Sequence, residues 1–122
     1  MQFLLIMHNN PAVWDALTDS ERDAVVTGHG QFIKTIQESG ELIVTQGLAD
    51  PSKSAVVRVR NGVPAVTDGP YLEAKEFLGG YYLVDCASRE RALELAALIP
   101  DASVPGLAIE VRPVMFSNGL EV

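Results

Sequence analysis

The sequence predicts a single α+β domain, on the strength of two observations. Strand-sized apolar segments alternate with amphipathic helical patterns, and 122 residues leave room for one domain and not two. The strand segments carry apolar residues on both faces, whereas each helical pattern carries them on one stripe. No internal repeat, low-complexity tract or linker interrupts this order, so we expect residues 1–122 to fold as one unit.

The first half of the chain has well-marked boundaries. Residues 2–8 predict a strand with apolar residues on both faces, followed by turn residues. The capping-box pattern of Thr18 and Glu21 begins a helix that we expect to run to about Ser39, where Gly40 ends it. Residues 41–48 predict the second strand. The apolar stripe of the helix comprises Val25, Phe32 and Ile36, with Val26 and Ile33 beside it.

The second half begins with the strongest hairpin signal of the chain. Residues 54–60 and 63–67 predict two strands joined by Asn61-Gly62, a pair typical of type I′ turns. Residues 77–85 predict a further strand, and residues 107–115 predict the last one, with Ile109 and Val111 on one of its faces. Between these two strands we expect a helix capped by Ser88 and closed by Pro100, with Leu93, Ala96, Ala97 and Ile99 facing the core.

Without the central hairpin, the element order is β-α-β-β-α-β. This order predicts a ferredoxin-like unit with an inserted β-hairpin, in which two helices cover one face of an antiparallel sheet. The opposite face has no helix left to cover it, yet the strands carry apolar residues there too. A second copy of the chain is the simplest cover, so we expect a homodimer.

Composition and charge exclude several classes of partner. Nine basic residues stand against 16 acidic ones, which gives a net charge of −7. This sign disfavours binding to nucleic acid and to anionic membranes. The apolar runs are too short to span a bilayer, the N-terminus lacks signal-peptide features, and one cysteine, Cys86, cannot form an internal disulfide. These features together predict a cytoplasmic protein.

One long motif carries a resemblance to a known family. Residues 67–84, TDGPYLEAKEFLGGYYLV, resemble the signature of the DGPF-type branch of the YCII-related family, with Tyr71 in place of the usual Phe. Residues 40–42, 57–59 and 109–113 add matches in the same order, so the resemblance covers nearly the whole chain. It implies a dimeric α/β barrel built from two ferredoxin-like units.

The resemblance implies less about function than about fold. Proteins with this architecture include small-ring isomerases, monooxygenases and dehalogenating enzymes, and some DGPF-type proteins are encoded beside or fused to extracytoplasmic-function sigma factors. Fold does not determine function in such a group. The wider family carries a histidine followed three residues later by an aromatic residue, and His29 with Phe32 matches that pattern.

His29 and Asp68 are the candidate catalytic pair. His29 lies on the apolar stripe of the first helix and is therefore expected to point toward the sheet, between Gly28 and Gly30, which allow a close approach. A histidine serves as acid or base near neutral pH, and a carboxylate can orient it. The alternatives are a buried structural imidazole and a turn in which Asp68 bonds to nearby amides.

Four further residues are candidates for substrate binding. Glu73 and Lys75 belong to a charged cluster that equally fits a solvated, salt-bridged loop. Either Tyr81 or Tyr82 faces the helices, because neighbours on a strand point to opposite sides, and Tyr82 is the candidate chosen here. Arg112 can clamp a carboxylate or pair with Glu110 across one residue.

Three functions fit these residues. The first is an acid–base enzyme of isomerase or lyase type, which acts on a small cyclic or aromatic metabolite through His29 and Asp68. The second is a small-ligand-binding or regulatory module. The third is a structural dimer without a site. No redox-cofactor motif is visible and no cofactor is expected; the spacing of His8, His29 and Asp68 does not enforce a metal site, and none is predicted.

Overall fold

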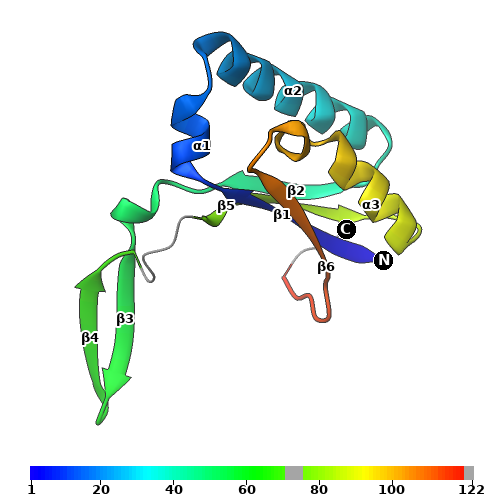
Figure 1. The fold of residues 1–122 in the computed structure, drawn as a ribbon. Helices are drawn as coiled ribbons and strands as arrows, with labels where there is room; N and C mark the ends of the chain where they lie inside the picture. The colour runs from blue at the N-terminus through cyan, green and yellow to red at the C-terminus, as the bar shows by residue number, and fades with distance from the viewer. Residues whose placement is uncertain (71–75, 120–122) are drawn as a thin grey trace.

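A four-stranded antiparallel sheet forms the body of the protein. The computed structural model describes residues 1–70 and 76–119. The strands of the sheet lie in the order β2 (Leu42–Gly47), β5 (Phe77–Asp85), β1 (Gln2–Asn9) and β6 (Ala108–Pro113) (Figure 1). Each neighbouring pair is antiparallel. The first strand of the chain therefore lies inside the sheet, between the last two.

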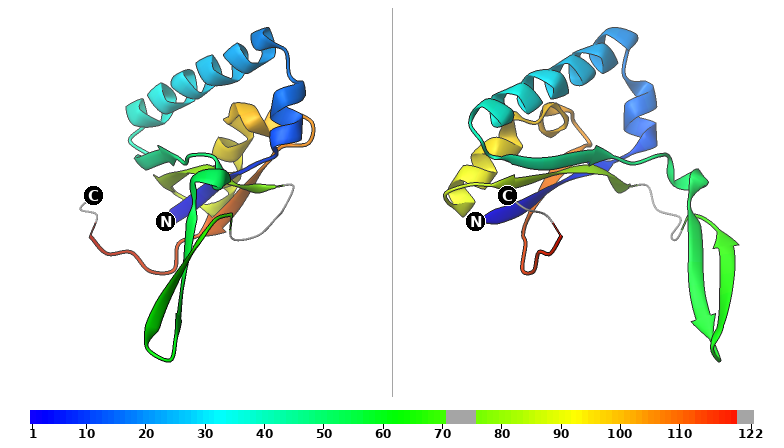
Figure 2. Two further views of the ribbon diagram at one scale, coloured as in Figure 1. Left: turned by 90° about the vertical axis from the view of Figure 1, so that its left-hand side faces the viewer. Right: turned by 180° about the vertical axis from the view of Figure 1, so that it is seen from behind.

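Three α-helices lie on one side of this sheet, and the other side carries none among the described residues (Figures 1 and 2). They are α1 (Pro11–Ala16), α2 (Asp19–Glu38) and α3 (Arg89–Leu98). The combination of helices with antiparallel sheets confirms the predicted α+β class. Helix α1 was not predicted; Asn10 caps it and Pro11 opens it. Within the described residues, no helix is both long and apolar enough to cross a membrane.

Helix α2 begins and ends as its sequence predicts. The Thr18 hydroxyl accepts a hydrogen bond from the Glu21 amide, and the Glu21 carboxylate accepts one from the Thr18 amide. Gly40 then takes a positive φ of 79°, which glycine adopts without steric cost. These two ends fix the length of the helix and therefore the position of its apolar stripe over the sheet.

The core lies between the helices and one face of the sheet. Val25, Phe32 and Ile36 of α2 are buried as predicted, whereas Val26 is 64% exposed on the outer side. The prediction for α3 was half right: Ala96 and Ile99 face the core, whereas Leu93 and Ala97 are exposed. The residues that face the core recur at steps of three and four, namely Ala92, Leu95, Ala96 and Ile99.

The predicted hairpin forms a sheet of its own. Strand β3 (Ala55–Arg60) pairs with β4 (Val63–Asp68) around Asn61 and Gly62, whose φ angles of 52° and 77° match a type I′ turn. A short 3₁₀ helix, η1 (Pro51–Lys53), leads into it. In all three views of Figures 1 and 2 the hairpin extends away from the body of the protein.

The face of the sheet without helices has an apolar centre and a polar margin. Leu4, Ile6 and His8 of β1 point to this face because they alternate with the core residues of the same strand. Leu83 lies opposite Leu4 in the register of β1 and β5. At the margin, His8 and Arg112 both bond to Glu110. Ile6 and Leu83 are 3% and 8% exposed, so the centre of this face, where the sequence predicted a second copy, is already largely buried in one copy.

Candidate functional site

His29 stands where α2 crosses the sheet. It follows the buried Val25 by one helical turn and precedes the buried Phe32 by three residues, so its ring points toward β5, as predicted. The Nδ1 atom of His29 lies 2.7 Å from the hydroxyl of Tyr82. Tyr82 itself is 1% exposed and packs edge-on against Phe32. A buried phenol thus meets a histidine at the interface of helix and sheet.

The carboxylate that binds His29 is Asp101. It belongs to the 3₁₀ helix η2 (Pro100–Ser103), which follows α3. Its Oδ1 atom lies 2.7 Å from Nε2 of His29, and the two side chains retain 14% and 23% of their exposed surface. The remaining exposure leaves an opening to solvent, so the pair is enclosed without being sealed.

A glycine brings the two partners together. A Cβ atom on Gly28 would lie 2.6 Å from Cγ of Pro100, closer than real contacts allow. Gly28 precedes His29 and Pro100 precedes Asp101, so this close approach sets the separation of the pair. Gly30, the other flanking glycine, would meet nothing within 4 Å. The sequence-based argument for a close approach therefore holds for Gly28 and not for Gly30.

The partners of His29 determine which ring nitrogen carries the proton. Burial, with a contribution from the Asp101 charge, raises the pKa of Tyr82 to about 12, so the phenol keeps its hydrogen. The Asp101 carboxylate can only accept, so Nδ1 of the neutral ring is the nitrogen that accepts from the Tyr82 hydroxyl. Nε2 of the neutral ring then carries the hydrogen and donates it to the Asp101 carboxylate. The three groups form a directed chain from Tyr82 through His29 to Asp101.

This chain is suited to proton transfer. When the imidazole of His29 takes up a second proton, the Asp101 carboxylate at 2.7 Å stabilises the resulting positive charge. The Tyr82 hydroxyl, on a side chain that is 1% exposed, holds Nδ1 from inside the protein. Its raised pKa makes it a hydrogen-bond donor rather than a phenolate base at neutral pH.

The predicted pair of His29 and Asp68 is not formed. Both ring nitrogens of His29 already have partners, Tyr82 and Asp101. Asp68 ends β4, where it lies opposite Ala55 and is exposed. Its strand belongs to the hairpin, which leaves the sheet that His29 covers, and this separation is the physical reason for the correction.

The other predicted binding residues lie in different places. Tyr82 contacts His29, and Tyr81 points to the opposite face, where its hydroxyl bonds to Gln46. Arg112 donates to Glu110 on the face without helices, which is the pairing named as its alternative role. Glu73 and Lys75 lie outside the described residues.

His8 has a partner of its own. Its Nε2 atom lies 2.7 Å from Oε1 of Glu110, on the face of the sheet opposite to His29. His8, His29 and Asp68 therefore do not converge. Across residues 1–70 and 76–119, no three histidine, cysteine or acidic side chains are grouped so that they could hold a metal ion.

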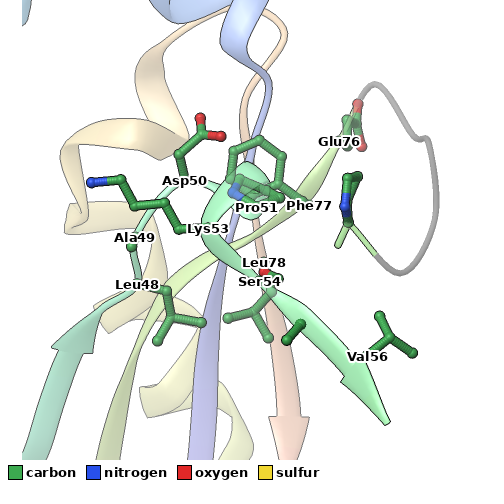
Figure 3. A pocket seen from close by; sticks show the side chains of 12 residues that line it. Leu48, Ala49, Asp50, Pro51, Lys53, Ser54, Val56, Glu76, Phe77 and Leu78 are labelled. Atoms are coloured by element: carbon green, nitrogen blue, oxygen red, sulfur yellow. The ribbon is translucent and has the colours of Figure 1, made fainter. Parts of the chain in front are cut away.

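A second candidate site is a pocket of about 660 Å³ at the base of the hairpin. Figure 3 shows its wall, which comes from the end of β2, from η1, and from the starts of β3 and β5. Most lining side chains are apolar, among them Leu48, Val56 and Phe77, with Asp50, Lys53 and Glu76 as the charged groups. Neither His29 nor Asp101 lines it. No local sequence signal predicts this pocket, because its wall joins residues 48–56, 70 and 76–78, which lie apart in the chain.

Comparisons with known proteins give one family model and one relative. A family model described as the YCII-related domain matches residues 1–116. An uncharacterised protein of Rhizobium meliloti (strain 1021) is 32% identical over 114 residues, which cover 93% of this chain and 92% of that protein.

Proposed function

Because the chain belongs to the YCII-related family, we propose that it is a small acid–base enzyme in which His29, backed by Asp101, transfers the proton. The observation that carries this proposal is the arrangement of His29. Both of its ring nitrogens have partners at 2.7 Å, while the side chain keeps 23% of its exposed surface. A purely structural histidine needs hydrogen-bond partners for its two nitrogens, but it does not need a side chain that is partly open to solvent.

The reaction class is isomerisation or elimination on a small cyclic or aromatic metabolite. In such reactions a base removes a proton next to a carbonyl group and a donor stabilises the oxygen that becomes negative. His29 would take the proton and Asp101 would stabilise the imidazolium. Tyr82 is 1% exposed and holds Nδ1, so substrate binding would have to part the two side chains; Nδ1 would then be free to take the proton, and the Tyr82 hydroxyl would donate to the oxygen.

We further propose that the four-stranded sheet is a ferredoxin-like unit of the DGPF-type branch, paired with a second copy as a dimeric α/β barrel. The strand order β2-β5-β1-β6 supports this reading. On the face without helices, Leu4 is half-buried and adds support, whereas Ile6 and Leu83 are already buried within one copy. Residues 67–84 carry the motif of that branch.

The proton-transfer role can be tested before the substrate is known. A panel of small lactones, cyclic enones and aromatic ketones is incubated with the protein in D₂O, and NMR records deuterium incorporation next to the carbonyl group. We expect incorporation with at least one compound, and a loss of about 100-fold or more in His29→Gln. His8→Gln is the matched control, because His8 also bonds a carboxylate at 2.7 Å but lies on the other face; it should keep the wild-type rate.

Equal incorporation by wild type and His29→Gln would refute the assignment of His29. The pocket at the base of the hairpin favours a second function, the binding of a small apolar ligand by a regulatory module. The resemblance to the DGPF-type branch implies that such a module would act with sigma factors. That function predicts ligand-induced NMR shifts at Phe77 and Val56, without deuterium incorporation and without any effect of His29→Gln.

A further inference from the structure

The pocket at the base of the hairpin has a wall that the fold holds in place. The Leu48 amide donates to the Gly79 carbonyl at 2.9 Å, which ties the end of β2 to β5. The Asp50 carboxylate accepts from the Ser52 amide at 2.9 Å and so caps η1. Preformed cavities of this kind, here about 660 Å³, are the usual form of small-ligand sites.

The Asp-Gly-Pro segment closes the base of the hairpin and supplies part of the wall. The Gly69 amide donates to the Ser54 carbonyl at 2.6 Å. A Cβ atom on Gly69 would lie 2.6 Å from Cβ of Ser54, closer than real contacts allow, so the two segments meet this tightly because residue 69 is a glycine. Pro70 follows and lines the pocket together with residues 76–78. These residues of the motif therefore build the pocket.

The apolar part of the wall is open to water. Leu48 and Leu78 are 54% and 40% exposed, and Val56 and Phe77 are half-buried. Contiguous apolar surface that stays exposed in a folded chain often marks a binding site. A ligand with an apolar body would remove this surface from water, which is favourable in proportion to the area that it covers.

Two of the three charged groups in the wall offset each other. The hydrogen bonds from Ser52 and the nearby Lys53 ammonium hold the pKa of the Asp50 carboxyl below its ordinary value, so this group is ionised at neutral pH. In Figure 3 the side chains of Asp50 and Lys53 lie on the same side of the Phe77 ring. Because their charges are opposite, this side of the pocket carries little net charge.

Glu76 is the uncompensated charge of the wall. It lies on the other side of the Phe77 ring in Figure 3, and it forms no hydrogen bond or ion pair with any residue in the ranges that the structure describes. Residues 71–75 contain one glutamate and one lysine, so that segment adds no net charge, and the whole chain carries −7. The field at the pocket therefore favours a cation.

We propose that the pocket binds an amphipathic amine, whose apolar body covers Leu48, Phe77 and Leu78 and whose ammonium group lies beside the Glu76 carboxylate. The face of the Phe77 ring, next to that carboxylate in the chain, also attracts a cation. This inference rests on the ligand-binding function proposed above for the pocket, to which it adds the chemical class of the ligand. It is independent of the role of His29.

The first test compares three probes that share a phenylalkyl body and differ in charge: phenylbutylamine, phenylbutanol and phenylbutanoate. Each is titrated into ¹⁵N-labelled protein, and NMR records the shifts of the Val56, Phe77 and Leu78 amides. We expect the amine to bind about threefold more tightly than the alcohol, because the attraction between partly exposed charges is modest. The carboxylate should bind most weakly.

The second test removes the charge of Glu76 without changing the shape of its side chain. Glu76→Gln should lower the affinity for phenylbutylamine about threefold, to that for phenylbutanol, and leave the affinity for phenylbutanol unchanged. Glu38→Gln is the matched control, because it changes the net charge by the same amount on an exposed residue at the end of α2, outside the pocket. It should leave both affinities unchanged.

The third test concerns the apolar body of the ligand. Leu48→Ser should weaken the binding of the amine and of the alcohol by the same factor, about threefold or more, because both lose the same apolar contact. Leu98→Ser is its control: Leu98 is 57% exposed, close to Leu48, but lies at the end of α3 and does not line this pocket. It should have no effect on either affinity.

The outcomes separate this inference from the function on which it rests. Equal affinities of the wild type for the amine and the alcohol, or an amine affinity that Glu76→Gln leaves unchanged, refute the amine class and retain ligand binding in the pocket. If no probe at millimolar concentration shifts the amides of Val56, Phe77 and Leu78, both the amine class and the ligand-binding function are refuted. Deuterium incorporation, measured on the same samples, judges the acid–base proposal separately.

Discussion

The hydroxyl of Tyr82 can be removed with little change of shape, which makes its bond to His29 the sharpest point to test. In Tyr82→Phe the ring keeps its edge-on contact with Phe32, whose centroid is 4.9 Å away. What disappears is the hydrogen bond to Nδ1 at 2.7 Å. A net hydrogen bond contributes about 0.5–1.5 kcal/mol, and an acceptor left without its donor costs about 1–3 kcal/mol.

The His29 side chain is 23% exposed, so water can reach Nδ1 in part and the loss falls toward the lower end. We expect Tyr82→Phe to lower the free energy of unfolding by about 1–2 kcal/mol, measured by urea denaturation. Tyr81→Phe is the control, because Tyr81 occupies the same strand and its hydroxyl bonds Gln46 in an exposed setting. It should change stability by less than about 0.5 kcal/mol.

The tautomer of His29 gives an independent check. With the Tyr82 hydroxyl present, ¹⁵N NMR should show the hydrogen on Nε2, where Asp101 accepts it. In Asp101→Asn the amide can donate to Nε2 instead, and the hydrogen should move to Nδ1. Equal stabilities of the two tyrosine variants, together with a Nδ1–H tautomer in the wild type, would refute the directed chain from Tyr82 to Asp101.

Two further predictions concern the support of the site and of the sheet. Gly28→Ala should lower the free energy of unfolding by about 1–3 kcal/mol, because its Cβ would lie 2.6 Å from Pro100. Gly30→Ala, whose Cβ meets nothing within 4 Å, should raise it by about 0.5–1 kcal/mol in thermal or urea unfolding. A Gly30→Ala protein less stable than Gly28→Ala would contradict this packing. The Arg91 guanidinium, which bonds the Glu41 carboxylate, holds the pKa of Glu41 below its ordinary value of 4.5. The ionised pair therefore stabilises the fold above pH 4.5, and this stabilisation is lost as the pH falls through the lowered pKa. Glu41→Gln should be less stable than wild type at pH 7 and equal to it in strong acid. A difference in unfolding free energy that does not change with pH would refute this.

Much of the fold was predictable because its signals are local. The capping box at Thr18 and the positive φ at Gly40 fixed both ends of α2. The Asn61-Gly62 pair fixed the hairpin. For α3 the prediction placed Ala96 and Ile99 correctly but chose Leu93 over Leu95, because both are leucines and local pattern alone did not show which of them meets β1 and β6. Only the packed sheet makes that choice.

The site was half predictable for the same reason. The helical stripe was enough to turn His29 toward the sheet, and strand alternation was enough to separate Tyr81 from Tyr82. The carboxylate partner was misassigned to Asp68 because Asp101 lies 72 residues from His29, in a turn after another helix. A usable signal was present: Pro100 ends α3 and commits Asp101 to a tight turn beside the helices, where the close contact with Gly28 brings it to His29.

The position of β1 inside the sheet has a consequence for how the chain is made. Every pairing in the four-stranded sheet involves β5 or β6, which begin at Phe77 and Ala108. While a ribosome is still synthesising the first 76 residues, β1 and β2 have no native strand to pair with, and only local elements such as α2 and the hairpin can form. Sheet formation therefore waits for late segments, and such non-local pairing folds slowly. Until then Phe3 and Leu5 are exposed on an unpaired strand, which makes the nascent chain a substrate for chaperones.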